Sequence, residues 1–263
     1  MNLQQQLIDL PPTKDFFIGI DSDGCVFDTM EIKHKECFCP NFIKYFGLQP
    51  VSKYAREVWE FVNLYSKTRG CNRFIALQEA FKYLNERADV QRRNFKTIDF
   101  SPLIEWTKKE TTLGNPALEE YAAEGHGPFI NLCLEWSKAV NISIEEIVYG
   151  ISPFPFVIEF LEAIKSKADV IVVSQTPLET LEREWEENSI DSYARVIAGQ
   201  EYGTKTEHIK YAATGKYNPN KMLMIGDAPG DLKAARSNNI LFFPVNPGNE
   251  EKSWGKIRER RHG

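Results

Sequence analysis

The segment that decides the fold runs from residue 16 to residue 29 and reads FFIGIDSDGCVFDT. Its first five residues are apolar or glycine, which is typical of a buried strand. The apolar run stops at Asp21, and a second carboxylate, Asp23, follows two positions later. Unpaired charges beside a core are costly, so this pair indicates a divalent cation or catalytic work rather than packing. A solvated turn is the simpler alternative when the pair is considered alone.

Composition narrows the class of protein. A chain of 263 residues can bury a substantial core and form one large domain or two modest ones. The net charge of −5 argues against a general nucleic-acid surface.

No apolar run approaches the roughly 20 residues that cross a bilayer, and the first residues do not resemble a secretion signal. The five scattered cysteines indicate free thiols and a reducing compartment. We therefore expect a cytoplasmic protein that binds neither nucleic acid nor membrane; its oligomeric state does not follow.

Periodicity predicts an α/β core. Short apolar segments alternate with helical patterns in the second half of the chain, as in a parallel sheet that helices cover on both faces. The predicted strands are residues 16–21, 170–173, 195–198, 222–225 and 240–245. This alternation predicts a Rossmann-like, doubly wound parallel sheet.

The first predicted strand is separated from the others by a long stretch with helical periodicity. An inserted all-helical cap domain explains this separation, so we expect a core of residues 1–29 and 152–263 and a cap of residues 30–151. Within the cap, Ser143 and Glu146 have the spacing of a helix-starting capping box. The basic tail from Lys252 to His262 is expected to be a solvated terminal turn.

Polar residues follow several predicted strands where each one ends. In an open parallel sheet, ligands bind beyond the carboxyl ends of the strands. The residues at these positions are Asp21 and Asp23 after the first strand, Ser174 after the second, Lys205 beyond the third, and Asp227 and Asp231 after the fourth. Taken singly, Ser174 also fits a helix N-cap and Lys205 a solvated helix lysine. Together they predict one site at one edge of the sheet.

These residues, in this order, resemble the four motifs of the haloacid dehalogenase-like superfamily, whose members are chiefly phosphatases. Residues 21–29 resemble motif one, Ser174 motif two, Lys205 motif three, and residues 226–231 motif four. The resemblance covers the core segments and implies a Rossmann-like fold, and the insert has the position of the family's helical cap. Lys210, farther along the same helix, is the alternative for motif three.

The chemistry of the side chains fits the same roles. A carboxylate can attack phosphorus to give an aspartyl-phosphate, which splits hydrolysis into two easier steps. We assign Asp21 as the nucleophile and Asp23 as the acid that protonates the leaving group and then activates water. Lys205 and Ser174 are expected to hold the phosphoryl oxygens.

An anionic nucleophile that approaches a phosphate needs a neutralising cation. We expect Mg²⁺, held by Asp21, by the backbone carbonyl of Asp23 and by Asp227. Asp231 is expected to bind the metal through water or to orient Asp227.

Substrate recognition is expected to come from a polar interruption between two cap helices, where Arg69, Asn72 and Arg73 stand close together. Arginine suits phosphate or carboxylate because its fork donates two hydrogen bonds. Gln175, beside Ser174, is a further candidate. An ordinary surface loop is the alternative for the cap residues.

The resulting hypothesis is an Mg²⁺-dependent phosphatase that hydrolyses a small phosphorylated metabolite through an aspartyl-phosphate. A phosphosugar mutase with the same phosphoaspartate is one alternative, and a non-catalytic binding protein on this fold is another. The sequence does not identify the substrate.

Overall fold

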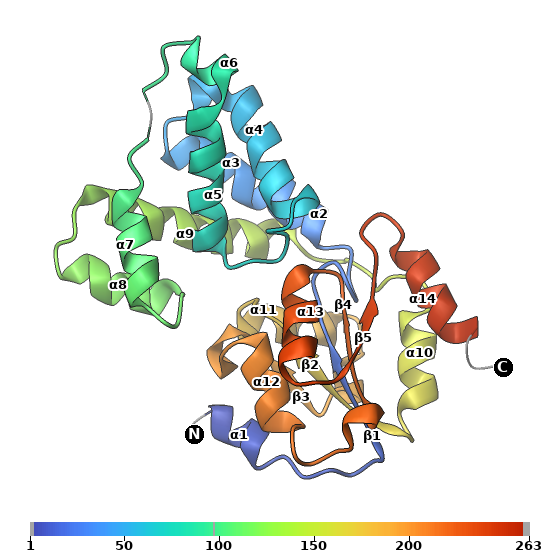
Figure 1. The fold of residues 1–263 in the computed structure, drawn as a ribbon. Coiled ribbons are helices and arrows are strands. Elements are labelled where there is room, and N and C mark those ends of the chain that lie inside the picture. Colours follow the sequence, from blue (N-terminus) through green and yellow to red (C-terminus); the bar gives the residue numbers. More distant parts are fainter. Residues whose placement is uncertain (1–2, 97, 260–263) are drawn as a thin grey trace. The chain divides into compact units, whose positions relative to one another are not determined.

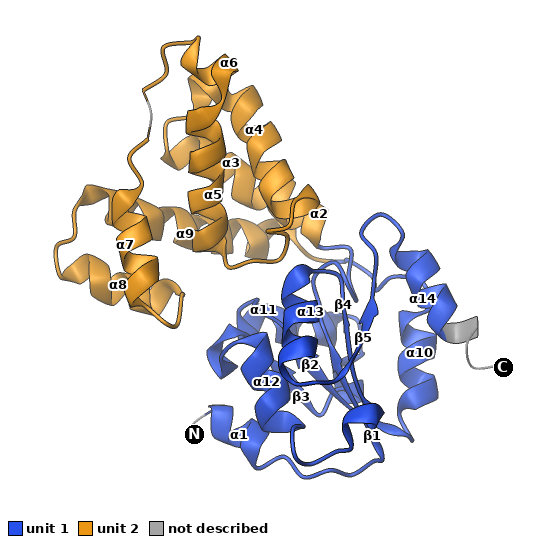
Figure 2. Ribbon diagram, viewed as in Figure 1, with its two compact units in different colours: residues 1–29, 150–263 blue, residues 30–149 orange. Residues whose placement is uncertain are grey.

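A computed structural model describes residues 3–96 and 98–259 and divides the chain into two compact units (Figure 2). An α/β unit contains residues 1–29 and 150–263, and a helical unit contains residues 30–149. The helical unit is thus an insertion between the first strand and the rest of the sheet.

The α/β unit is built on a five-stranded sheet in the order β3-β2-β1-β4-β5 (Figure 1). The strands are β1 (Phe16–Ile20), β2 (Ala168–Val173), β3 (Val196–Ala198), β4 (Met222–Gly226) and β5 (Leu241–Pro244). Every neighbouring pair is parallel. The predicted doubly wound parallel sheet is therefore confirmed. The strand order changes direction between β1 and β4, which is where ligands bind in folds of this kind.

Helices cover both faces of this sheet. Side chains of β1 alternate, because Phe17 packs against one face while Ile18 and Ile20 pack against the other. One face is covered by α1 (Leu3–Ile8), α12 (Lys205–Ala212) and α13 (Pro229–Ser237). The other is covered by α10 (Val157–Ile164), α11 (Leu178–Glu187) and α14 (Glu250–Glu259). The alternation of strands and helices predicted for the second half of the chain is thus present in the structure.

Helix α14 corrects one expectation. The segment from Lys252 was predicted to be a solvated turn, but it lies in a helix whose Trp254 is fully buried. The ring of Trp254 packs against Phe160 of α10 with 5.3 Å between the ring centroids. The remainder of the predicted tail, residues 260–263, lies outside the described residues.

The helical unit buries an aromatic core. Its helices are α2 (Met30–Ile32), α3 (Cys39–Tyr45), α4 (Ser52–Glu60), α5 (Arg73–Glu86), α6 (Ala88–Gln91), α7 (Ser101–Lys109), α8 (Asn115–Ala123) and α9 (Pro128–Ile147). Two π-helical segments, Lys33–Phe38 and Phe61–Tyr65, follow α2 and α4. Trp59 and Trp136 meet edge to face at the centre of this core, with ring centroids 5.8 Å apart.

Ser143 and Glu146 lie inside α9, so the predicted capping box is wrong. The hydroxyl of Ser143 instead accepts a hydrogen bond from Nδ2 of Asn41, at 2.8 Å. The spacing was therefore a coincidence of composition within a longer helix. Nowhere in residues 3–96 and 98–259 is a helix both long enough and apolar enough to cross a membrane.

Asp169 fixes the N-terminal end of the sheet, opposite the strand ends that carry the predicted site. Its buried carboxylate accepts hydrogen bonds from the backbone N–H groups of Thr13 (2.7 Å) and Lys14 (3.0 Å) and from the hydroxyl of Tyr217 (2.6 Å). Burial raises the pKa of Asp169, but these hydrogen bonds outweigh that effect and hold the pKa below its usual value. The folded state therefore favours the ionised form.

Replacing Asp169 by Ala should lower the free energy of unfolding by about 3 kcal/mol at pH 7, because three part-buried hydrogen bonds to its carboxylate are lost at once. A depressed folded-state pKa stabilises the fold above the unfolded-state pKa of about 3.9, and this contribution is lost as the pH falls through the folded-state value. Urea unfolding at pH 7 and at pH 3 measures both effects. The matched control is Asp15→Ala, whose side chain is 83% exposed. Equal destabilisation by the two substitutions would contradict this prediction.

Candidate active site

A tight turn presents Asp21 at the end of β1. The backbone N–H of Asp21 donates to the carbonyl of Ile225 in β4 at 2.9 Å, so the strand pairing continues to this residue. The carbonyl of Ser22 then accepts the N–H groups of Cys25, Val26 and Phe27. Residues 21–27, called here the Asp21 turn, are therefore folded back on themselves. Gly24 permits this because its φ of 73° lies in the left-handed region.

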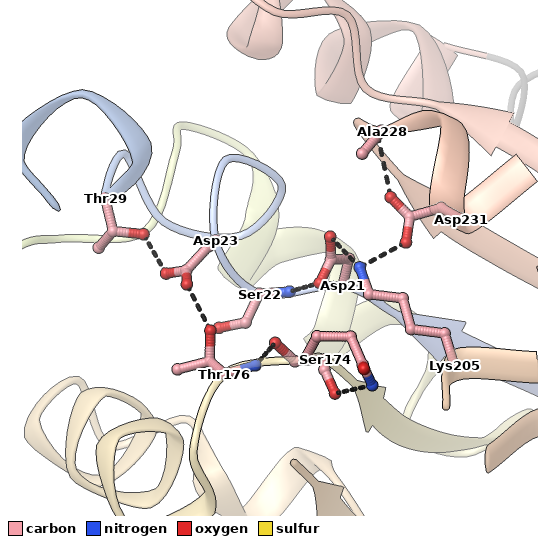
Figure 3. Close-up of polar contacts among 10 residues, drawn as sticks. Asp21, Ser22, Asp23, Thr29, Ser174, Thr176, Lys205, Ala228 and Asp231 are labelled. Atoms are coloured by element: carbon pink, nitrogen blue, oxygen red, sulfur yellow. Dashed lines mark hydrogen bonds and ion pairs between the residues drawn. The ribbon is translucent and has the colours of Figure 1, made fainter. Parts of the chain in front are cut away.

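Lys205 joins two carboxylates in this site (Figure 3). Its Nζ lies 2.8 Å from Oδ2 of Asp21 and 2.6 Å from Oδ1 of Asp231. All three side chains are buried, with relative exposures of 9% for Lys205, 4% for Asp21 and 0% for Asp231. Lys210, the alternative for motif three, is exposed. The geometry thus brings Lys205 rather than Lys210 to the strand ends.

The electrostatics of the cluster are strongly coupled. Burial raises the pKa of Asp21 well above its usual value, and the Asp231 carboxylate adds to the increase while Lys205 opposes it. Burial lowers the pKa of Lys205, but the carboxylates of Asp21 and Asp231 outweigh burial and raise it above its usual range. Lys205 is therefore a permanent cation at neutral pH.

The three carboxylates of Asp21, Asp227 and Asp231 suit a divalent cation. One oxygen from each lies within 4.8 Å of the others, and hard carboxylate oxygens are the ligands that Mg²⁺ takes in proteins. The repulsion that raises the pKa of Asp21 would be relieved by such an ion. Both oxygens of Asp231 already accept hydrogens, one from Lys205 and one from the backbone N–H of Ala228. These two contacts hold the Asp231 carboxylate in place beside the other two carboxylates.

Gly226 makes room for the Asp231 carboxylate. A Cβ atom at position 226 would lie 2.3 Å from Cγ of Asp231, a distance that real Cβ contacts do not show. The end of β4 and the first turn of α13 can therefore approach closely only because residue 226 is glycine. Close approach of backbone is a common reason for glycine at a site.

Asp23 has a different environment from Asp21. Its carboxylate accepts hydrogen bonds from the hydroxyls of Thr29 (2.5 Å), which follows it closely in the chain, and of Thr176 (2.7 Å), in the loop after β2 (Figure 3). The three carboxylates that could share a metal ion do not include that of Asp23, and coordination by its backbone carbonyl stays a prediction. Thr176 is not among the residues predicted for the site. Its position two residues after Ser174, in the same strand-end loop, is the signal that could have found it.

Ser174 and Gln175 lie in the loop after β2. Ser174 is 2% exposed, and its Oγ accepts the backbone N–H of Thr176 at 3.1 Å. Helix α11 begins only at Leu178, and its N-cap is Pro177, so Ser174 caps a loop turn rather than that helix. Nε2 of Gln175 donates to the carbonyl of Gly203 at 2.9 Å and so connects this loop to the segment before Lys205.

The three predicted recognition residues of the cap lie in the helical unit. Asn72 caps α5, because its Oδ1 accepts the N–H of Phe74 and its Nδ2 donates to the carbonyl of Leu113. Both ends of its amide are therefore engaged in structure. Nη1 of Arg69, which is buried, donates to the carbonyl of Leu64 at 3.3 Å.

Arg73 has a more unusual setting. Its Nη1 donates to the side chains of Ser137 (3.0 Å) and Asn141 (2.6 Å), and its guanidinium lies over the ring of Phe38 at 5.1 Å. Burial lowers its pKa to about 10, so it stays charged at neutral pH. No carboxylate in the described part of the chain forms an ion pair with it.

These features define a class: a doubly wound α/β protein with carboxylates and a lysine at its topological switch point. Residues 72–245 match the haloacid dehalogenase-like hydrolase family, and the chain belongs to that family. The matched segment contains Ser174, Lys205 and Asp227 but begins after the Asp21 turn. It therefore supports the assignment independently of motif one.

Solved structures support the fold. A protein described as a haloacid dehalogenase-like hydrolase, from Bacteroides fragilis, is 15% identical with a TM-score of 0.54, and the match covers 91% of this chain and 93% of the other. A protein described as a phosphoglycolate phosphatase, from Lactobacillus delbrueckii subsp. bulgaricus, is 14% identical with a TM-score of 0.53, and the match covers 94% and 98%. A search of curated proteins found no match.

The close approach at Gly226 gives a prediction. Gly226→Ala should destabilise the α/β unit by about 1–3 kcal/mol, because the added methyl group must displace the Asp231 carboxylate or the strand end. The matched control is Gly230→Ala in the first turn of α13, where a Cβ would meet nothing within 4 Å. Thermal unfolding of the two variants measures the difference. Equal stability would show that Asp231 can move without loss.

Proposed function

We propose that the protein is an Mg²⁺-dependent phosphatase that hydrolyses a small phosphorylated metabolite through an aspartyl-phosphate on Asp21. The observation that carries this proposal is the buried Asp21 carboxylate at the tip of β1, held by Lys205 and close to Asp227. A buried, oriented carboxylate of this kind is suited to nucleophilic attack. Membership of a hydrolase family supports the same reaction type.

The nucleophile is held at both of its oxygens. Oδ1 of Asp21 accepts the backbone N–H of Ser22 at 2.8 Å, and Oδ2 is paired with Lys205. The carboxylate therefore keeps one orientation as it attacks phosphorus. Lys205 also offers its charge to the phosphoryl oxygens as the new P–O bond forms. Ser174 is the hydroxyl that we expect to donate a hydrogen bond to the same group.

Asp23 moves the proton in both steps. In the first step Asp21 attacks phosphorus, the bond from phosphorus to the leaving oxygen breaks, and Asp23 gives its proton to that oxygen. In the second step Asp23 takes a proton from water, whose oxygen attacks the phosphoaspartate and releases phosphate and the Asp21 carboxylate. The hydroxyls of Thr29 and Thr176 can serve both forms of Asp23, because a hydroxyl both donates and accepts.

The metal would be held by Asp21, Asp227 and the backbone carbonyl of Asp23, with Asp231 orienting the site through Lys205 and Ala228. When bound, Mg²⁺ supplies positive charge that stabilises negative charge on the phosphoryl group.

Asp21→Asn should reduce phosphate release by at least about 10³-fold, because the amide is a poor nucleophile while the fold keeps its shape. Phosphate release from a panel of phosphorylated metabolites, with Mg²⁺ and with EDTA, measures the effect and ranks substrates. Asp15→Asn, an exposed acid on the same segment of chain, is the control. Undiminished turnover by Asp21→Asn would contradict the assignment of Asp21 as the nucleophile. A wild type that releases phosphate from no member of the panel would contradict the phosphatase proposal.

We further propose that Arg73 contributes to recognition of an anionic group on the substrate, with Arg69 and Gln175 as weaker candidates. Arg73 is charged and bonded to neutral oxygens, so its charge can still attract an anion. Arg69 and Gln175 are already bonded to backbone carbonyls.

Arg73→Ala should raise KM about tenfold for a metabolite that carries a second anionic group, and should leave KM for p-nitrophenyl phosphate unchanged, because one charge-assisted contact is lost. Steady-state kinetics with both substrates separates recognition from damage to the fold. Arg56→Ala, an exposed arginine of the same unit, is the control. Equal effects on the two substrates would place Arg73 outside the recognition surface.

A further inference from the structure

Two buried tryptophans donate hydrogen bonds to the Asp21 turn. Nε1 of Trp185, on α11, donates to Oγ of Ser22 at 3.1 Å, and Nε1 of Trp254, on α14, donates to the carbonyl of Cys25 at 2.9 Å. Both side chains have no exposed surface. The two donors thus reach the same short turn from two different helices.

Both bonded positions are mechanically connected to the nucleophile. Ser22 donates its own backbone N–H to Oδ1 of Asp21, and its carbonyl accepts the N–H of Cys25. A shift of Ser22 or Cys25 therefore changes the direction of the Asp21 carboxylate. Small misplacements of reacting groups are expensive in rate, since about 1 Å can reduce turnover about 10²-fold.

The two indole rings are themselves rigidly held. The ring of Trp185 packs edge to face against Phe27 at the end of the turn, with centroids 6.0 Å apart. Trp254 is packed against Phe160, and its neighbour Ser253 fixes the start of α14 by accepting the N–H of Asn246 at 3.1 Å. Aromatic donors with few rotatable bonds are well suited to fix a backbone turn.

We propose that Trp185 and Trp254 are positioning residues for the reaction, which hold the Asp21 turn so that the Asp21 carboxylate keeps its attacking orientation. This inference rests on the proposed role of Asp21 as nucleophile. Neither indole touches the candidate metal ligands or Lys205 through a hydrogen bond, so the two residues act through the turn alone.

The test replaces each indole by a phenyl ring, which keeps apolar packing and removes the N–H donor. Trp254→Phe and Trp185→Phe should each lower kcat about tenfold with KM within about twofold of wild type, because a buried acceptor in the turn loses its partner. The matched control is Trp106→Phe in the helical unit, since Nε1 of Trp106 donates to no described residue. The control should retain wild-type kcat.

A second readout does not depend on turnover. Hydrogen exchange of the backbone amides of residues 22–27, followed by mass spectrometry, should become faster in both variants and remain unchanged in Trp106→Phe. Faster exchange together with reduced kcat supports the inference, and unchanged exchange in the turn overturns it. If one variant does not fold, the other provides the same test, because the two donors act on different residues.

The controls also separate this inference from the proposed function. A wild-type protein that releases no phosphate would overturn the proposed function and, with it, any catalytic role for the two tryptophans. An active wild type with fully active Trp185→Phe and Trp254→Phe variants would overturn the positioning role alone.

Discussion

The ion pairs of Lys205 are the interaction on which the rest of the site depends. A carboxylate at the tip of a buried strand and a second one at the start of α13 would repel each other in a medium of low polarity. The ammonium of Lys205 lies within 3 Å of both and offsets part of that repulsion. The absence of a side chain at Gly226 leaves room for the Asp231 carboxylate to lie against the end of β4 and contact the ammonium. The ends of β1 and β4 and the first turns of α12 and α13 are thereby held at one place.

Asp21 and Asp23, the two carboxylates after β1, are close in the chain but have different partners. Asp21 lies among charges and is directed to Lys205, whereas Asp23 is directed to two hydroxyls. A carboxylate paired with an ammonium is held in one orientation, and a carboxylate bonded to two hydroxyls can keep these contacts whether or not it carries a proton. The sequence places the acids two residues apart, and the fold gives them different partners.

How much the sequence could predict depends on the range of the contacts involved. The five strands and the acids at their ends were predictable, because apolar runs and strand termini are local patterns. The bond from Thr176 to Asp23 was not, since 153 residues separate the partners and no local pattern pairs them. Trp254 was hidden by the charged residues around it, which suggested solvent. Ser143 shows the opposite error, in which a local spacing predicted a helix start inside a helix that continues through it.

The hydrogen bond from Trp254 to the Asp21 turn has a consequence for the order in which the site forms during synthesis. Cys25 belongs to the first loop after β1, yet its donor Trp254 stands 229 residues later, on α14. During synthesis Asp21 leaves the ribosome early, while Trp254 is added only when the last described helix is made. A nascent or shortened chain can therefore hold the acids of the site without holding them still. The Asp21 turn receives its full set of hydrogen bonds only when α14 has packed against the α/β unit.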